Sequence, residues 1–390
     1  MKKTVSINIK TTVSLLLAAI LLALAGCSGG GSAPSDSASP SPTQSDAPET
    51  ATASASAQPS QSAEPDADAE KEPFTLRVVD PPYDYLEFVT AWELGFFEDA
   101  GINIEFVGSL STGLTDYQAI EQGIIDASYS GHPSGVAQAR AAGLKVTIAA
   151  PGMIDTPESP HVTYLVHKDS PLQTLADLHG GVKVGIAGIG SCTSGYVEYQ
   201  VLKNGYPKDD VEFITFSSGA GTMEQAVIQG DIDVTTSHTP YAEITLKTGE
   251  VRAIGNTYDI FNNPAGGLGA RVLADRIIEE HPDVAQGFVD AMYRARLWTN
   301  DHFEEAGDIV AAVLGLEKGD VLAIYQDPNK NVDPAYLDIW FDLAVQTGIL
   351  DEGVISKDEI YTNKFVPADA PASDKTLAWD GVPNRVFHVD

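Results

Sequence analysis

The sequence feature that most constrains the fold is an internal repeat. Residues 104–133 align without a gap on residues 211–240, at an offset of 107, and twelve of the thirty positions are identical. The identical pairs include Gly123/Gly230 and Asp126/Asp233. Solenoid repeats have periods of about 20 to 50 residues. The longer offset therefore predicts two copies of a whole subdomain.

Each copy alternates short apolar strands with helices that end at glycine. We expect strands at 76–79, 104–107, 125–129 and 146–149 in the first copy, and at 182–187, 211–216, 232–236 and 251–254 in the second. Helices are expected at 88–100, 116–122 and 133–142. This alternation predicts an α/β fold with mainly parallel sheets flanked by helices. Two such lobes predict a cleft in which the carboxyl ends of both sets of strands contact a ligand.

The last third of the chain is expected to be helical. An apolar stripe with helical spacing runs through Val284, Phe288, Ala291, Ala295 and Trp298. A second helix is predicted to begin at Asp333-Pro334, which is a capping residue followed by a first-turn proline. That helix is expected to stop before Gly348.

The first 26 residues have the pattern of an export signal. Basic residues precede the apolar run 11–25, which is shorter than the roughly 20 residues that a membrane span requires. The run ends in Leu24-Ala25-Gly26-Cys27, which resembles the bacterial lipobox, and this resemblance implies cleavage before Cys27 and lipidation of its sulfur. Residues 28–73 are rich in Ser, Ala, Pro and acidic residues, so we expect a disordered tether.

The charge and cysteine content exclude several classes of protein. The formal net charge of −32 argues against a nucleic-acid partner, because phosphate binding needs a basic patch. Only two cysteines occur, and the lipidation of one leaves Cys192 without a disulfide partner. The folded part must therefore be stabilised by its core.

The folded part resembles the nitrate/sulfonate/taurine family of substrate-binding proteins of ABC transporters. The stretches that carry the resemblance are 91–101, 122–126, 175–185 and 229–233. It implies a type II periplasmic-binding fold with a discontinuous first lobe at 74–169 and 264–390 and a second lobe at 170–263. It also implies an extracytoplasmic, membrane-anchored monomer that has no cofactor and no enzymatic activity, and that passes a small molecule to an ABC permease and ATPase.

Candidate ligand contacts lie where the expected strands end. In the first lobe they are Asp80, Pro82, Tyr83, Ser109, Thr112, Ser130, Gly131 and His132. In the second lobe they are Gly190, Ser191, Cys192, Thr193, Ser194, Ser218, Ser237, His238 and Tyr241. The turn at 190–194 presents hydroxyls and helix N-terminal amides, which favour an anion, although simple helix capping explains the same residues. Cys192 is interpreted as a small apolar filler rather than a nucleophile.

Several alternatives stay open at this point. Gly188-Ile189-Gly190 imitates a dinucleotide fingerprint, but Thr193 stands at its third glycine position. A pyrimidine synthase of related fold would need a cysteine-rich iron motif, which two cysteines cannot supply. The eight histidines are scattered and form no His-Glu-x-x-His motif, so no metal site is predicted. The solute could be a sulfonate, taurine, nitrate, a thiamine-precursor pyrimidine or another small aromatic compound, and a ligand-sensing lipoprotein is an alternative to transport.

Overall fold

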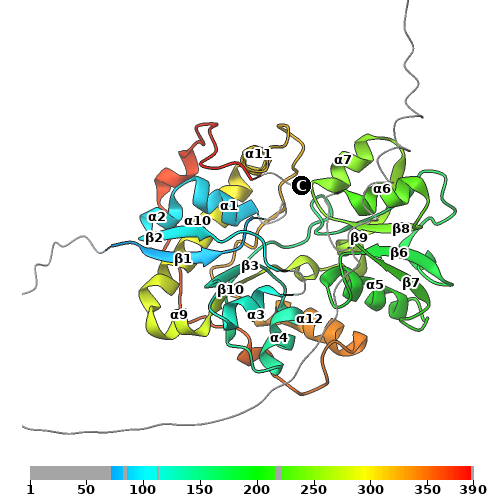
Figure 1. Ribbon diagram of the computed structural model, residues 1–390, viewed down its shortest axis with the longest axis horizontal. Helices are drawn as coiled ribbons and strands as arrows, with labels where there is room; N and C mark the ends of the chain where they lie inside the picture. The colour runs from blue at the N-terminus through cyan, green and yellow to red at the C-terminus, as the bar shows by residue number, and fades with distance from the viewer. Residues whose placement is uncertain (1–71, 82–85, 112–113, 217–220, 388–390) are drawn as a thin grey trace, which may run out of the picture. The chain divides into compact units, whose positions relative to one another are not determined.

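The computed structural model describes residues 72–81, 86–111, 114–216 and 221–387 (Figure 1). The predicted signal peptide, Cys27 and nearly all of the tether lie outside these ranges. The described strands form three sheets, with the orders β1-β2, β3-β10-β4 and β7-β6-β8-β5-β9. Their bounds are β1 Phe74–Val78, β2 Ile102–Phe106, β3 Ala127–Gly131, β4 Val146–Pro151, β5 Thr163–His167, β6 Val182–Ile186, β7 Val211–Thr215, β8 Val234–Ser237, β9 Val251–Asn256 and β10 Ala270–Ala274.

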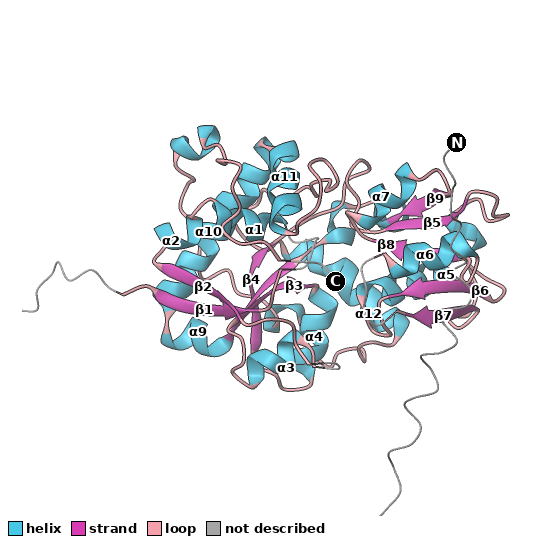
Figure 2. Cartoon of the chain, turned by 45° about the horizontal axis from the view of Figure 1, so that its top comes forward, coloured by secondary structure: helices cyan, strands magenta, loops and turns pink. Residues whose placement is uncertain are grey.

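Helices flank these sheets (Figure 2). Those of the repeated part are α1 Leu86–Glu93, α2 Phe96–Asp99, α3 Asp116–Glu121, α4 Pro133–Ala141, α5 Cys192–Lys203, α6 Thr222–Gln229, α7 Tyr241–Lys247 and α8 Thr257–Phe261. Those that follow are α9 Asp275–Glu280, α10 Pro282–Asp301, α11 Phe303–Val313 and α12 Pro334–Thr347. Among the described residues, no helix has the length and apolar character that crossing a membrane requires.

The strand pairing confirms the duplication and extends it. β1 pairs in parallel with β2, and β6 pairs in parallel with β7 in the equivalent register. Each half also contains one antiparallel strand, because β10 lies between β3 and β4 while β5 lies between β8 and β9. Strands β5 and β10 begin at Thr163 and Ala270, which are again 107 residues apart. The two copies have therefore exchanged equivalent strands, and the result is the two-lobed type II periplasmic-binding fold.

This exchange was not predicted from the alternation of strands and helices, which indicates parallel pairing only. It also bears on the lobe boundary. β5 pairs within the five-stranded sheet, so by strand pairing that sheet begins at Thr163 and not after residue 169. The ranges 74–169 with 264–390 and 170–263 stay a prediction, and we propose moving the first boundary to the segment between β4 and β5.

Glycine interrupts the first predicted helix. Residues 88–100 were expected to form one helix, but Gly95 adopts a left-handed φ of 74° and separates α1 from α2. The prediction for α12 is confirmed, since Asp333 caps it by accepting the N–H of Ala335 and Gly348 ends it at φ 76°. The predicted stripe of α10 is also confirmed, because all five of its apolar residues are buried.

A repeated aspartate makes the same contact in both copies. The carboxylate of Asp126 accepts the backbone N–H of Arg77, and the N–H of Asp126 donates to the carbonyl of Arg77. Asp233 makes both bonds with Lys183. Asp126 additionally accepts the guanidinium groups of Arg77 and Arg276. The identical aspartates of the repeat therefore join β1 to the start of β3 in the first copy and β6 to the start of β8 in the second.

The two aspartates allow a matched test of this contact. Asp126→Asn is expected to lower the free energy of unfolding by about 2 kcal/mol, because it weakens charge-assisted hydrogen bonds at a buried carboxylate. Asp233→Asn should cost less, about 1 kcal/mol, because Asp233 is exposed and no cationic side chain pairs with it among the described residues. Urea unfolding of both variants measures the difference. Equal losses would contradict the assigned role of the two arginines.

Candidate functional site

Two segments connect the sheets to one another. Residues 152–162 join β4 to β5, and residues 257–269 join β9 to β10; we call them the crossing segments. They run side by side, with Gly152 and Asp155 donating backbone N–H groups to Gly269 and Pro264 over 2.8 and 2.9 Å. The predicted site residues that contact one another lie around this pair of segments.

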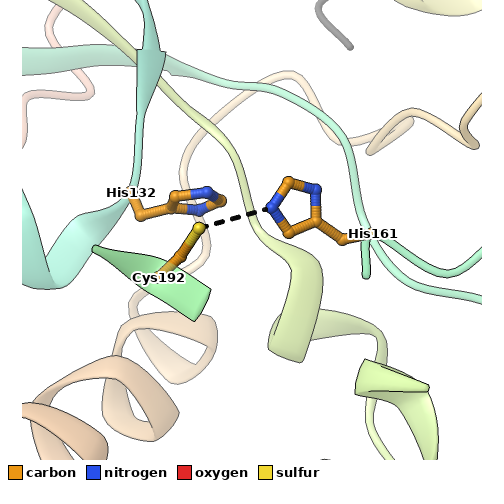
Figure 3. A group of neighbouring side chains, drawn as sticks. All are labelled: His132, His161 and Cys192. Atoms are coloured by element: carbon orange, nitrogen blue, oxygen red, sulfur yellow. Dashed lines mark hydrogen bonds between the residues drawn. The ribbon is translucent and has the colours of Figure 1, made fainter. Parts of the chain in front are cut away.

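Three histidines and one cysteine form a cluster beside the crossing segments. His132 follows β3, His161 lies in the first crossing segment, and Cys192 opens α5 after β6 (Figure 3). The Cys192 sulfur lies 3.8 Å from His161 Nε2 and 4.0 Å from Nε2 of His238, which follows β8. The His161 ring stands edge-on to the rings of His132 and His238, with both centroid distances 4.8 Å. We call these four residues the histidine–cysteine cluster.

His132 is held from two sides. Its Nδ1 lies 2.9 Å from the carbonyl oxygen of Leu268 in the second crossing segment. Its ring stacks on Trp340 of α12 at 4.7 Å, and Trp340 itself donates to the carbonyl of Ala265. The ring is 9% exposed and its Nε2 has no partner among the described residues. The free ring nitrogen is therefore fixed in a direction rather than left to rotate.

The three histidine rings of the cluster are uncharged near pH 7. Burial lowers the pKa of His132 to about 4, with a smaller opposing effect from the hydrogen bond to Leu268. Burial and the neighbouring ring of His132 lower the pKa of His238 to about 4 as well. Burial lowers the pKa of His161 well below its usual range, and the charges of the two other histidines act in the same direction. The rings therefore offer neutral donors and acceptors instead of positive charge.

The turn before α5 is closed by its own hydroxyls. Gly190, at φ 82°, donates its N–H to Ser194 Oγ, and Ser191 caps the helix by accepting the N–H of Ser194. Ser191 Oγ also donates to the carbonyl of Gly188 and shares a hydrogen bond with Thr193 Oγ1. Capping thus accounts for the hydroxyls of Ser191, Thr193 and Ser194. Their contact with a ligand stays a prediction.

Several predicted residues support the strands locally. Ser130 donates to Asp116, and the repeat-related Ser237 donates to Glu224. A Cβ on Gly131 would come 2.7 Å from the Tyr117 hydroxyl, so Gly131 permits a close approach. Ser109 is exposed, Asp80 has one buried carboxylate oxygen without a partner among the described residues, and Tyr241 is half-buried at the start of α7. Pro82, Tyr83, Thr112 and Ser218 lie outside the described residues.

One residue of the cluster, His161, and its neighbour Asp155 were not predicted as site residues from the sequence. His161 and Asp155 both lie in a crossing segment and not at a strand end. Asp155 accepts the backbone N–H of His161 and the hydroxyl of Thr257, so it ties the two crossing segments together. Burial raises the pKa of Asp155 to about 7. The signal that could have found them is the offset of 107, which marks β5 as a repeat of β10 and residues 152–162 as a connection between lobes.

A comparison with protein families gives one match. The family model described as NMT1/THI5 like matches residues 83–306, which is more than half of the chain. A protein of Bacillus subtilis (strain 168) named "Putative aliphatic sulfonates-binding protein" is 24% identical over 253 residues, covering 63% of this chain and 70% of that protein. These matches confirm the resemblance to the nitrate/sulfonate/taurine binding proteins.

Solved structures show the same fold. The periplasmic aliphatic sulphonate binding protein SsuA of Escherichia coli superimposes with a TM-score of 0.58 at 19% identity, covering 77% of this chain and 96% of that structure. The desulfurization enzyme DSZB superimposes with a TM-score of 0.52 at 20% identity, covering 75% and 97%. The fold is therefore shared by binding proteins and by at least one enzyme, so the fold alone does not separate the two activities.

The low histidine pKa values predict a stability loss in acid. In the unfolded chain these histidines bind protons below about pH 6.5, whereas in the folded chain they do so only below about pH 4. The free energy of unfolding therefore falls as the pH falls through this window. For His132 alone the loss is about 3 kcal/mol. His132→Gln should remove that part of the slope when Tm is followed from pH 7 to pH 4.

The control for this measurement is His179→Gln, since His179 stacks on Tyr206 and takes no part in the cluster. Asp155 changes the free energy of unfolding in the opposite direction. Because its pKa is raised in the folded state, its contribution to stability is lost as the pH rises toward 7. The comparison is therefore made between variants and not on the wild-type curve. An unchanged slope in His132→Gln would contradict the neutral, buried state of this ring.

Proposed function

This chain belongs to the family described as NMT1/THI5 like, and on that premise we propose that it is an extracytoplasmic solute-binding protein that captures a small molecule for an ABC importer. The observation that supports the proposal most directly is that the residues of the histidine–cysteine cluster come from different sheets. His132 follows a strand of one sheet, whereas Cys192 and His238 follow strands of the other. A solute bound there would contact both lobes at the carboxyl ends of their strands, where open α/β sheets bind ligands.

The proposed solute is a sulfonate or a similarly small oxyanion. The N-terminus of the twelve-residue helix α5 points its first backbone amides and its dipole into the turn at 190–194. Neutral His161 and His238 can donate ring N–H groups to sulfonate oxygens without a charge of their own, whereas the N–H of His132 is directed at the carbonyl of Leu268. The relative from Bacillus subtilis is named for aliphatic sulfonates, which agrees with this choice.

A second candidate solute is a neutral planar heterocycle, such as a thiamine-precursor pyrimidine or another small aromatic compound. It is favoured by the absence of positive charge on the three rings and by the aromatic surroundings that His132, Trp340 and Tyr196 provide. Rings with free nitrogens hydrogen-bond a pyrimidine edge as well as they bond an anion. The two candidates differ in charge, so a ligand panel separates them.

Capture would proceed by closure of the lobes on the solute. A ligand shifts an open–closed equilibrium only by its difference in affinity for the two states, and contacts to both lobes supply that difference. No chemical step on the solute is required. We therefore propose that the protein binds its solute without catalysing a reaction. As a monomer, it would then deliver the solute to a permease. A ligand-sensing lipoprotein would use the same closure.

A ligand panel tests the proposed function. Taurine, an alkanesulfonate and MOPS should raise the Tm of the purified full-length chain, and small-angle scattering should show a smaller radius of gyration with the ligand that raises it most. His238→Ala should weaken binding of that ligand by about tenfold or more, the cost of one hydrogen bond to a bound solute. Stabilisation by neutral pyrimidines but not by sulfonates would replace the first candidate with the second. No shift with either class would contradict both.

Anchoring is tested separately from binding. Cys27→Ser removes the sulfur that lipidation needs, so the variant should move from the membrane fraction to the soluble extracytoplasmic fraction while its ligand-induced Tm shift stays the same. Metabolic labelling with a radioactive fatty acid should be lost at the same time. Continued membrane attachment of Cys27→Ser would show that the anchor is not at this residue.

A further inference from the structure

The histidine–cysteine cluster has the donor set of a metal site. Neutral imidazole nitrogens and a cysteine sulfur are ligands that Zn²⁺ and other borderline-soft cations prefer in proteins. The ligand atoms of His132, His161 and Cys192 all lie within 4.8 Å of one another. Two of these residues are nearly or fully buried, with exposures of 9% and 1%. Buried donors gathered at this spacing need an explanation beyond packing.

The hydrogen bonds leave the right atoms available. His132 Nδ1 faces a carbonyl oxygen, which only accepts, so Nδ1 carries the proton and Nε2 carries a lone pair. A histidine that donates one ring N–H to a backbone carbonyl while its other nitrogen stays bare is the usual arrangement of a metal ligand. The bare Nε2 of His132 has no partner among the described residues. Buried polar atoms without partners are rare in folded proteins and mark a place for a missing ligand.

The distances between the donors are longer than those around a coordinated ion. Zn–N bonds of about 2.0 Å and a Zn–S bond of about 2.3 Å hold tetrahedral donors roughly 3.5 Å apart. The Cys192 sulfur lies 3.8 Å from His161 Nε2 and 4.0 Å from His238 Nε2. Figure 3 shows the sulfur directed toward the rings of both His132 and His161. The ligand atoms of His132, His161 and Cys192 are up to 4.8 Å apart, so binding one ion would draw these donors together by about 1 Å.

We propose that His132, His161 and Cys192 are the protein ligands of one Zn²⁺ ion or a cation of similar softness. Binding deprotonates the Cys192 thiol and releases that proton to solvent. The site thus holds one thiolate and two imidazole rings around the ion.

The surrounding charges permit this ion. The charge of Arg271 acts on the rings of His132 and His161, but Arg271 is fully buried in an ion pair with Glu87. The carboxyl of Asp155 lies behind His161 and accepts its backbone N–H. Tyr164 of β5 is the other titratable group close to both Cys192 and Asp155. With the thiolate included, the ion and its ligands carry one net positive charge, which Asp155 can balance when it is ionised.

This inference goes beyond the proposed solute-binding function and has its own consequence. The ligands come from the end of β3, from a crossing segment and from the five-stranded half, so a bound ion would link the two halves. Failure of metal binding and failure of sulfonate binding are distinguished by repeating the ligand panel in the presence of EDTA and by running the metal titration without sulfonate.

The test uses the metal alone. The full-length chain, freed of metal with EDTA and kept reduced, should bind one equivalent of Zn²⁺ by native mass spectrometry, and its Tm should rise with Zn²⁺ concentration but not with Mg²⁺. Titration in weak buffer near pH 7 should release about one proton per ion. Co²⁺ in place of Zn²⁺ should give visible bands of a tetrahedral site together with a sulfur-to-metal charge-transfer band.

Variants assign the ligands. Cys192→Ser should remove the charge-transfer band and the released proton, and should weaken Zn²⁺ binding more than about 100-fold, since loss of an outer-shell partner alone costs about 10 to 100-fold. His161→Gln should weaken binding to a similar degree, whereas the control His167→Gln, at the half-buried end of β5, should bind as the wild type does. Circular dichroism of each variant checks folding. Zn²⁺ binding that is unchanged in Cys192→Ser, or no stoichiometric binding by the wild type, would overturn the proposal.

Discussion

The antiparallel contact between the two crossing segments is the constraint on which the rest of the site depends. The ladder of β4 and β10 continues past the sheet, since Gly152 donates to the carbonyl of Gly269 and Asp155 to that of Pro264. At Gly267 the backbone leaves no room for a side chain, because a Cβ there would lie 2.5 Å from Asp155 Oδ1. The two halves are therefore joined through a narrow, hydrogen-bonded strip, which is a natural place for a hinge because few residues need to change their backbone angles.

The same strip supplies the acceptors that orient the cluster's surroundings. Its carbonyls each take one hydrogen bond from a ring of another element, namely Leu268 from His132, Gly266 from Tyr196 and Ala265 from Trp340. These rings come from α5, α12 and the end of β3, so three elements meet at one stretch of backbone. Any rearrangement of the crossing segments is expected to move the binding residues with it. Closure and binding are in this way mechanically coupled.

Much of the fold could be predicted from the sequence, because the identical residues of the repeat make the same contacts in both copies. Asp126 and Asp233 are identical because each closes the same pair of backbone hydrogen bonds. Ser130 and Ser237 are identical because each donates to an acidic residue of the preceding helix, Asp116 of α3 or Glu224 of α6. The site was harder to predict. His132, Cys192 and His238 were found because they end strands, but His161 follows no strand, and its proximity to them depends on the exchange of β5 and β10. Strand exchange is a long-range pairing choice that local patterning does not encode.

Hydrogen exchange measured along the chain tests the central claim most directly, namely that one small molecule is held between the two halves. With a saturating solute, the account predicts slower amide exchange both in residues 130–136 of the first half and in residues 188–196 of the second, together with slower exchange in the crossing segments. Protection confined to one half, with the other unchanged, would show that the solute binds to a single lobe and would contradict the account.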